Sequence, residues 1–181
     1  MKKSGFKHLY YSSEDILLIL DSYSDLFSDF DPRPYSEKSL SEDFLLECRK
    51  ASQDKKRDIH IRFFLPKQKR EPMDEIKIKK RMKEHFHMHL IQSRKVIEKI
   101  KVRGFAWFIA GSFLIIITAL LPNQFNSILL KILINLAHPG GWFFLWEGLA
   151  KLLITTKEKR PVYEFYKKMV NSKISFSDYK K

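Results

Sequence analysis

The 181-residue sequence contains a single cysteine, and this scarcity limits how the chain is stabilised. Cys48 has no partner for an internal disulfide, so the fold needs no oxidising compartment. Because Leu45 and Leu46 precede it closely, we interpret Cys48 as a core residue and not as a nucleophile. The N-terminal residues also lack the apolar segment of a cleavable signal peptide, so we expect internal segments to drive any membrane insertion.

Charge is absent from one long stretch, Gly104–Leu121, which also lacks proline. A helix of about 18 residues is roughly 27 Å long, close to the thickness of a hydrocarbon core. A helix that is apolar on all sides lies in lipid or at the centre of a large protein. This chain is too short to surround it with a soluble core. The stretch is therefore predicted to span a membrane, in preference to forming a buried core helix.

A second apolar region, from Ile128 to Ile154, is interrupted by polar residues and by a sequence that breaks helices. Its length of about 27 residues is enough to cross a bilayer even with a kink. We favour a kinked span over the alternative, which is a re-entrant half-helix followed by an interfacial amphipathic helix. The polar and kink positions within this region are Lys131, Asn135, His138, Pro139, Gly140, Gly141, Glu147 and Lys151.

Two pairs of residues in this second region have specific expected roles. Trp142 and Trp146 are predicted to anchor the helix at the membrane interface, because an indole combines an apolar ring with one polar donor. Glu147 and Lys151 are four residues apart, in the favourable order for a helical ion pair. A carboxylate inside a membrane is costly and often functional. Near the membrane edge, however, we favour a structural ion pair over an ion pathway.

The formal net charge is +13, and it is unevenly distributed. Residues 14–47 are mainly acidic and residues 49–103 are strongly basic, which suggests an anionic partner such as a lipid surface or a nucleic acid. Basic residues flank the two predicted spans and the loop between them is uncharged, so the positive-inside rule places both termini in the cytoplasm of a cell membrane protein. The cations expected to contact anionic headgroups are Lys95, Lys99, Lys101, Arg103, Lys157, Lys159 and Arg160.

The acidic segment is predicted to form a short helical hairpin. Ser13–Phe30 has apolar residues three and four apart and acidic residues in its first turn, which favours a helix. The prolines of Asp31–Pro34 end this helix. Ser39 and Glu42 then have the spacing of a capping box for a second helix.

The clearest strand pattern is Asp58–Leu65, in which apolar and polar residues alternate. A lone strand leaves its backbone groups unpaired, so we expect this one to pair with Lys173–Ser177, which also alternates. Phe6–Tyr11 is a weaker third candidate. Pairing of the first two strands requires both flanks of the predicted membrane segment to lie on the same side of the bilayer.

A long basic helix is predicted to join the soluble part to the membrane. It begins at Pro72, has an apolar stripe that includes Met82 and Phe86, and continues uninterrupted past Arg103. After the second span, Pro161 suits the first turn of a last helix. The predicted parts are residues 1–71, a small cytoplasmic domain; 72–103, a stalk helix; 104–155, the membrane hairpin; and 156–181, a helix and strand that pack back on the first domain.

The expected fold class is thus a mainly α membrane protein, in which a two-span helical hairpin is joined by a long basic helix to a small α+β cytoplasmic domain. Two stretches resemble a known family: Leu20–Glu47, LDSYSDLFSDFDPRPYSEKSLSEDFLLE, and His138–Leu149, HPGGWFFLWEGL. They are similar to stretches of small prokaryotic membrane proteins that have two predicted transmembrane helices and no settled biochemical role. The resemblance implies this topology and no reaction. In those relatives an acidic residue often stands where this chain has His138.

The sequence favours a membrane-anchored interaction or scaffold module, with self-association or a protein partner through the cytoplasmic domain. The alternative is an oligomeric pore or membrane-disrupting effector, in which Lys131, Asn135 and Glu147 would face inward. Nucleic-acid binding has charge in its favour but no recognition motif.

The sequence has no phosphate loop or nucleophile elbow, and His85 and His89, although four residues apart, lack further ligands. We therefore expect no enzyme, metal or cofactor.

Overall fold

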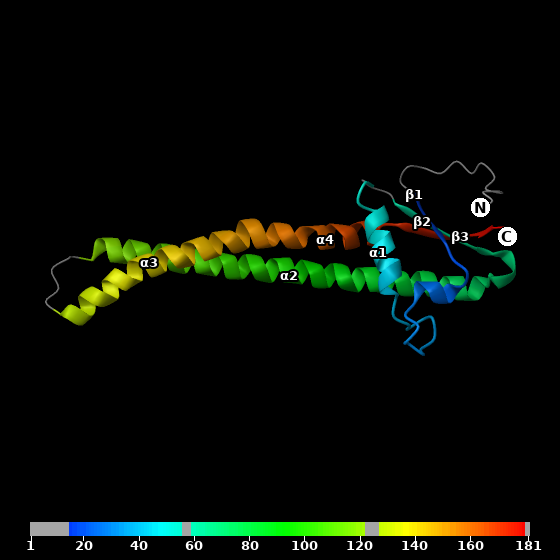
Figure 1. Ribbon diagram of the computed structural model, residues 1–181, viewed down its shortest axis with the longest axis horizontal. Helices are drawn as coiled ribbons and strands as arrows, with labels where there is room; N and C mark the ends of the chain where they lie inside the picture. Colours follow the sequence, from blue (N-terminus) through cyan, green and yellow to red (C-terminus); the bar gives the residue numbers. More distant parts are fainter. Residues whose placement is uncertain (1–14, 56–58, 122–126, 180–181) are drawn as a thin grey trace. The chain divides into compact units, whose positions relative to one another are not determined.

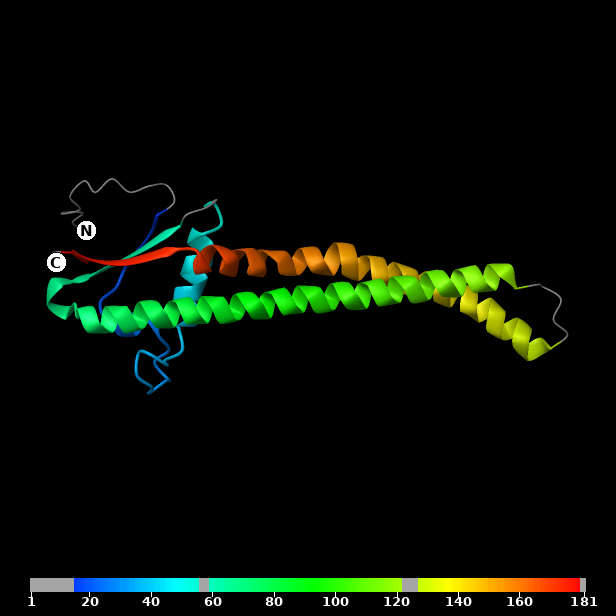
Figure 2. The same ribbon diagram turned by 180° about the vertical axis from the view of Figure 1, so that it is seen from behind.

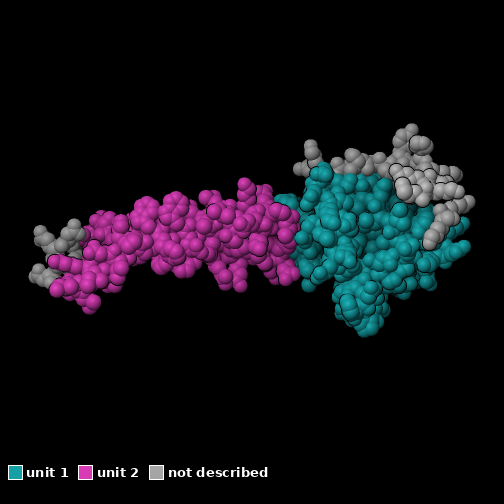
Figure 3. All heavy atoms as spheres, viewed as in Figure 1, with its two compact units in different colours: residues 1–91, 164–181 teal, residues 92–163 magenta. Residues whose placement is uncertain are grey.

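The computed structural model describes residues 15–55, 59–121 and 127–179. The chain forms two compact units, which are coloured separately in Figure 3. Unit 1 contains Met1–Ile91 and Glu164–Lys181, and unit 2 contains Gln92–Tyr163. Most of the described residues are helical, and the strands are confined to unit 1 (Figure 1).

Unit 1 contains a sheet of three parallel strands in the order β1-β2-β3: β1 (Asp15–Ile19), β2 (His60–Pro66) and β3 (Lys173–Tyr179). The predicted pairing of the last two strands is confirmed. Phe63 in the central strand lies opposite Leu18 on one side and Phe176 on the other. Phe63 is fully buried, so the centre of the sheet is also the centre of the core of unit 1.

The helix predicted from Ser13 to Phe30 is wrong over its described part, because Asp15–Ile19 is β1 and only Tyr23–Leu26 (η1) forms a single 3-10 turn. The spacing of its apolar residues fitted a helix, but this spacing reflects only neighbours in the sequence and not the strands that the segment pairs with. The buried strand β2 has two edges with backbone groups to satisfy. β3 pairs with one edge, and β1 supplies hydrogen-bond partners for the other. No helical hairpin forms within residues 15–55, and the alternative strand Phe6–Tyr11 lies outside the described residues.

The second acidic helix is confirmed as α1 (Glu42–Ala51), but its N-cap is Ser41 and not Ser39. The backbone amide of Ser39 instead donates to Asp31 Oδ2 at 2.7 Å, and the Arg33 guanidinium donates to both carboxylate oxygens of Asp31. These bonds, first the one from Arg33, hold the pKa of Asp31 well below its usual range. The predicted turn is therefore present, and it leads into α1 without a preceding helix.

Three helices supply the rest of the core of unit 1. Phe44 of α1 packs on Phe63, with ring centroids 5.9 Å apart. Met82 and Phe86, two members of the predicted stripe of α2 (Pro72–Leu120), are fully buried. Met169 of α4 (Thr156–Val170) is buried as well. Because the strands alternate with helices and are all parallel, the small domain predicted as α+β has β-α-β connections.

The long helices continue through positions where the sequence suggested interruptions. α2 is unbroken from Pro72 to Leu120, as predicted, and α3 (Ile128–Ala150) contains Pro139 in its interior. The half-helix break required by the re-entrant alternative is absent from α3. Figure 2 shows the first turns of α3 directed away from α2, whereas its later turns run beside α2. A bend at a helical proline is the usual consequence of its missing amide hydrogen.

A π-helical turn, η3 (Lys151–Thr155), connects α3 directly to α4. The prediction that Pro161 would occupy the first turn of the last helix is wrong, because α4 begins at Thr156 and Pro161 lies in its interior. A proline removes one hydrogen-bond donor, and the adjoining turns of a continuous helix compensate for this loss. α4 buries one apolar face, since Phe165, Tyr166 and Met169 are buried.

Candidate functional site

The two apolar segments of unit 2 are in backbone contact at two pairs of glycines. Gly104 of α2 lies against Gly148 of α3, and Gly111 lies against Gly141, so the spacing is seven residues on both helices. A Cβ atom on Gly111 would come within 2.4 Å of the backbone nitrogen of Leu145. This distance is far too short for any side chain, so glycine is required at this contact. We call residues 104–121 and 128–155 the hairpin.

Side chains also contact each other between the two glycine pairs and beyond the second one. The rings of Trp107 and Phe144 pack with centroids 4.8 Å apart. Beyond the second glycine pair, His138 Nδ1 lies 3.2 Å from Thr118 Oγ1. The Thr118 hydroxyl donates to backbone carbonyls of its own helix, which leaves its oxygen to accept from His138.

The outer surface of the hairpin is apolar and exposed. Two helical stretches of the described chain, Pro72–Leu120 and Ile128–Val170, are long and apolar enough to cross a membrane. Only 11% and 6% of their most apolar windows are buried within the structure. Large exposed side chains of the hairpin include Phe105, Ile109, Phe113, Leu120, Leu129, Leu133, Leu136 and Phe143.

The two glycine pairs fix the register between α2 and α3, and so give the distance of each predicted polar residue from the middle of the hairpin. The middle of the uncharged run, at Ser112, falls opposite Pro139 and Gly140. At about 1.5 Å per residue, His138 lies roughly 2 Å from this middle, Asn135 about 7 Å and Lys131 about 13 Å. All three side chains are exposed.

On the other side of the middle, Glu147 and Lys151 form the predicted ion pair within α3 and its continuation. They lie beside Gly104, at the end of the uncharged run, because a Cβ on Gly104 would meet Lys151 Cβ at 3.0 Å. Trp142 and Trp146 are both exposed. By residue count, Trp146 lies about 10 Å from the middle of the hairpin and Trp142 only about 4 Å.

The cations predicted to contact lipid are all exposed. They lie within α2 just before the hairpin and in the first turns of α4 just after it: Lys95, Lys99, Lys101, Arg103, Lys157, Lys159 and Arg160. Nearby, Arg94 is paired with Glu98 at 2.8 Å. The seven cations therefore form a solvent-facing basic region next to the exposed apolar surface.

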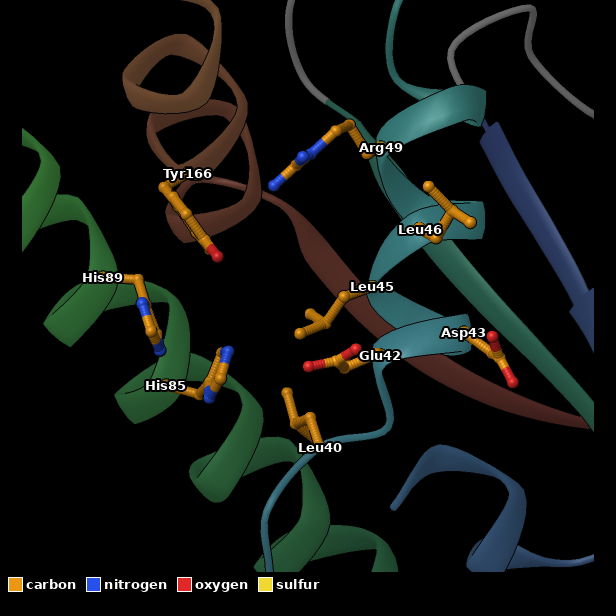
Figure 4. Close-up of a pocket in the computed structure, with 9 residues that line it drawn as sticks. All are labelled: Leu40, Glu42, Asp43, Leu45, Leu46, Arg49, His85, His89 and Tyr166. Atoms are coloured by element: carbon orange, nitrogen blue, oxygen red, sulfur yellow. The ribbon is translucent and has the colours of Figure 1, made fainter. Parts of the chain in front are cut away.

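Unit 1 contains a groove that the sequence did not indicate (Figure 4). It has a volume of about 540 Å³ and is lined from three helices. His85 and His89 come from α2, with ring centroids 4.3 Å apart, and Tyr166 of α4 stacks on His89. The remaining lining residues lie on α1 or just before it: Leu40, Glu42, Asp43, Leu45, Leu46 and Arg49.

The groove does not form a metal site or a nucleophile site in the described chain. No three histidine, cysteine, aspartate or glutamate side chains are gathered closely enough to hold a metal ion in residues 15–55, 59–121 and 127–179. Cys48 of α1 is fully buried, and burial raises the pKa of its thiol to about 12. A buried thiol with this pKa is not a nucleophile at neutral pH, which agrees with its interpretation as a core residue.

From the sequence, Gly104, Gly111 and Ser112 were small surfaces suited to close helix contact, and Gly141 was only a kink position. The sequence did not predict which glycines pair, and it gave Gly148 no role. The available signal was the repeated spacing of seven between small residues in both apolar segments. The groove had no comparable signal, because its walls come from three separate segments of the chain, which hold Leu40–Arg49, His85 and His89, and Tyr166. Comparison with known proteins finds no matching family model, no matching curated protein and no matching solved structure.

Proposed function

We propose that this protein is an integral membrane protein in which the hairpin anchors unit 1 as an interaction or scaffold module, with both termini in the cytoplasm. The supporting observation is that the most apolar helical windows are 11% and 6% buried. A core helix of a soluble protein buries most of such a window, whereas in a membrane protein lipid covers it. Close backbone contact at small residues is also typical of membrane helix pairs.

The basic region gives the anchor its proposed orientation. Lys101 and Arg103 directly precede the first span, and Lys157 and Lys159 directly follow the second. Each cationic residue near an anionic leaflet contributes about 1 kcal/mol of attraction. Because the excess of cations is on this side, the positive-inside rule places unit 1 in the cytoplasm.

The orientation is tested by labelling one cysteine in bacterial cells. In a Cys48→Ala background, Asn171→Cys places a thiol at an exposed position of unit 1. We expect a membrane-impermeant maleimide to label it only after permeabilisation. Neutralising Lys95, Lys99, Lys101 and Arg103 together to Gln should expose part of the population to labelling from outside, because roughly 4 kcal/mol of attraction to the cytoplasmic leaflet is removed.

The matched control removes the same charge from exposed positions of unit 1, by changing Lys50, Lys80, Lys83 and Lys167 to Gln. This variant should keep the labelling pattern of the parent protein. Labelling of the parent without permeabilisation would contradict the cytoplasmic placement. Identical behaviour of the two quadruple variants would show that the basic region next to the hairpin does not set the orientation.

A further inference from the structure

One stripe of α3 places polar side chains on the exposed surface of the hairpin. Lys131, Asn135, His138, Trp142 and Trp146 follow one another at intervals of four, three, four and four residues, which aligns them on one flank of the helix. All five are exposed. We call these residues the polar stripe. The flank facing away from it carries Leu133 and the Glu147–Lys151 ion pair.

Within the polar stripe, Asn135 is the side chain whose transfer into lipid costs free energy that no contact in the described part of the structure offsets. Among the described residues its side chain has no hydrogen-bond partner, and it lies about 7 Å from the middle of the uncharged run, well inside a hydrocarbon core. His138 lies still deeper, and its Nδ1 atom lies 3.2 Å from Thr118 Oγ1. Lys131 lies about 13 Å from the middle, within reach of the headgroups.

Unpaired polar groups in hydrocarbon cost free energy, and membrane helices satisfy such groups by associating. A carboxamide is both donor and acceptor, so Asn135 is complementary to itself. Copies of one chain insert with the same orientation, and a two-fold axis along the membrane normal therefore brings equivalent residues together at the same depth. A second copy of this chain therefore matches Asn135 in both depth and chemistry.

We infer that the polar stripe is the interface with a second copy of this chain, in which Asn135 of each copy hydrogen-bonds to the other copy. This inference rests on the proposed membrane function. It names the surface through which the hairpins of two copies associate. The hydrogen bonds between the two carboxamides supply the partners that lipid does not.

Cysteine cross-linking in vesicles tests which flank of α3 faces the second copy. Purified full-length protein with Cys48→Ala is reconstituted at high dilution in lipid and oxidised. Lys131→Cys lies on the polar stripe, and Leu133→Cys is exposed on the facing-away flank at nearly the same depth. We expect disulfide-linked dimers from the first variant only. Equal cross-linking of the two variants, or none, would overturn the assignment.

The role of Asn135 is tested in the Lys131→Cys background. Asn135→Leu should weaken dimerisation in the bilayer by roughly 5- to 30-fold, as expected for one interhelical polar contact, whereas Leu133→Ala should leave it unchanged. An unchanged dimer after Asn135→Leu contradicts the inference. Flotation of each variant with the vesicles is measured separately, so a protein that fails to insert contradicts the proposed membrane function and not only the interface.

Discussion

His85 shows how the fold changes the chemistry of a single side chain. Its Nε2 atom is buried and has no hydrogen-bond partner within the described chain. Burial, followed by the nearby charges of His89 and Arg81, lowers the pKa of His85 to about 4. The imidazole is therefore neutral at physiological pH, although it lines a groove that also contains Glu42.

This shift predicts how the stability of unit 1 depends on pH. The unfolded chain takes up a proton at His85 near pH 6.5, whereas the folded chain does so only near pH 4. Stability is therefore lost as the pH falls from about 6.5 to 4, because the unfolded state binds more protons there. After allowance for partial exposure, the loss at pH 5 should be on the order of 1 kcal/mol.

Urea unfolding of the full-length protein in detergent, at pH 7 and pH 5, measures this loss. Comparison with His85→Gln isolates the contribution of one group from those of the other titrating residues. The variant should lose about 1 kcal/mol less than the parent protein between the two pH values. Exposed His87, two residues away, provides the matched control as His87→Gln. Equal pH dependence of parent and His85→Gln would rule out a neutral buried imidazole.

At the scale of elements, the glycine pairs determine how closely α2 and α3 approach. We predict that Gly111→Ala destabilises the hairpin by roughly 1–3 kcal/mol, because the new Cβ would overlap the backbone of α3. Gly140→Ala is the control, since its nearest neighbour would be Leu114 Cδ2 at 4.0 Å. Titration with SDS, followed by the fluorescence of the three tryptophans, all of which lie in the hairpin, measures the separation of the helices. Similar midpoints for the two variants would contradict a backbone contact at Gly111.

The sequence correctly predicted the helices and strands that are marked by a residue pattern within their own segment. Alternation predicted β2, and the absence of charge predicted the continuous end of α2. It failed for Asp15–Ile19, where pairing with a strand more than 40 residues away overrides a helical pattern. The prediction that the last helix begins at Pro161 also failed, because a helix that continues on both sides of a proline tolerates one missing hydrogen-bond donor.

Within the candidate site, some features depend on one helix alone and others on contacts between distant segments. The Glu147–Lys151 pair follows from spacing on a helix and was predicted. The seven cations are exposed, and their contact with lipid stays a prediction. The polar stripe also follows from spacing, but its significance depends on which face of α3 the glycines cover, and this requires the register between two helices. The groove requires the complete fold of unit 1.

At the scale of the whole molecule, the account depends on where the apolar surface of unit 2 lies. All three tryptophans of the chain, Trp107, Trp142 and Trp146, are in the hairpin, so intrinsic fluorescence reports on this region alone. In lipid, their rings would lie within about 10 Å of the middle of the hairpin.

The most direct measurement is quenching of this fluorescence by lipids brominated along their acyl chains. Full-length protein reconstituted in vesicles of brominated lipid should lose most of its tryptophan emission relative to vesicles of the unbrominated lipid, because bromine quenches only on contact. Emission that is equal in the two vesicle types would place the tryptophans outside the hydrocarbon and would contradict the membrane anchor.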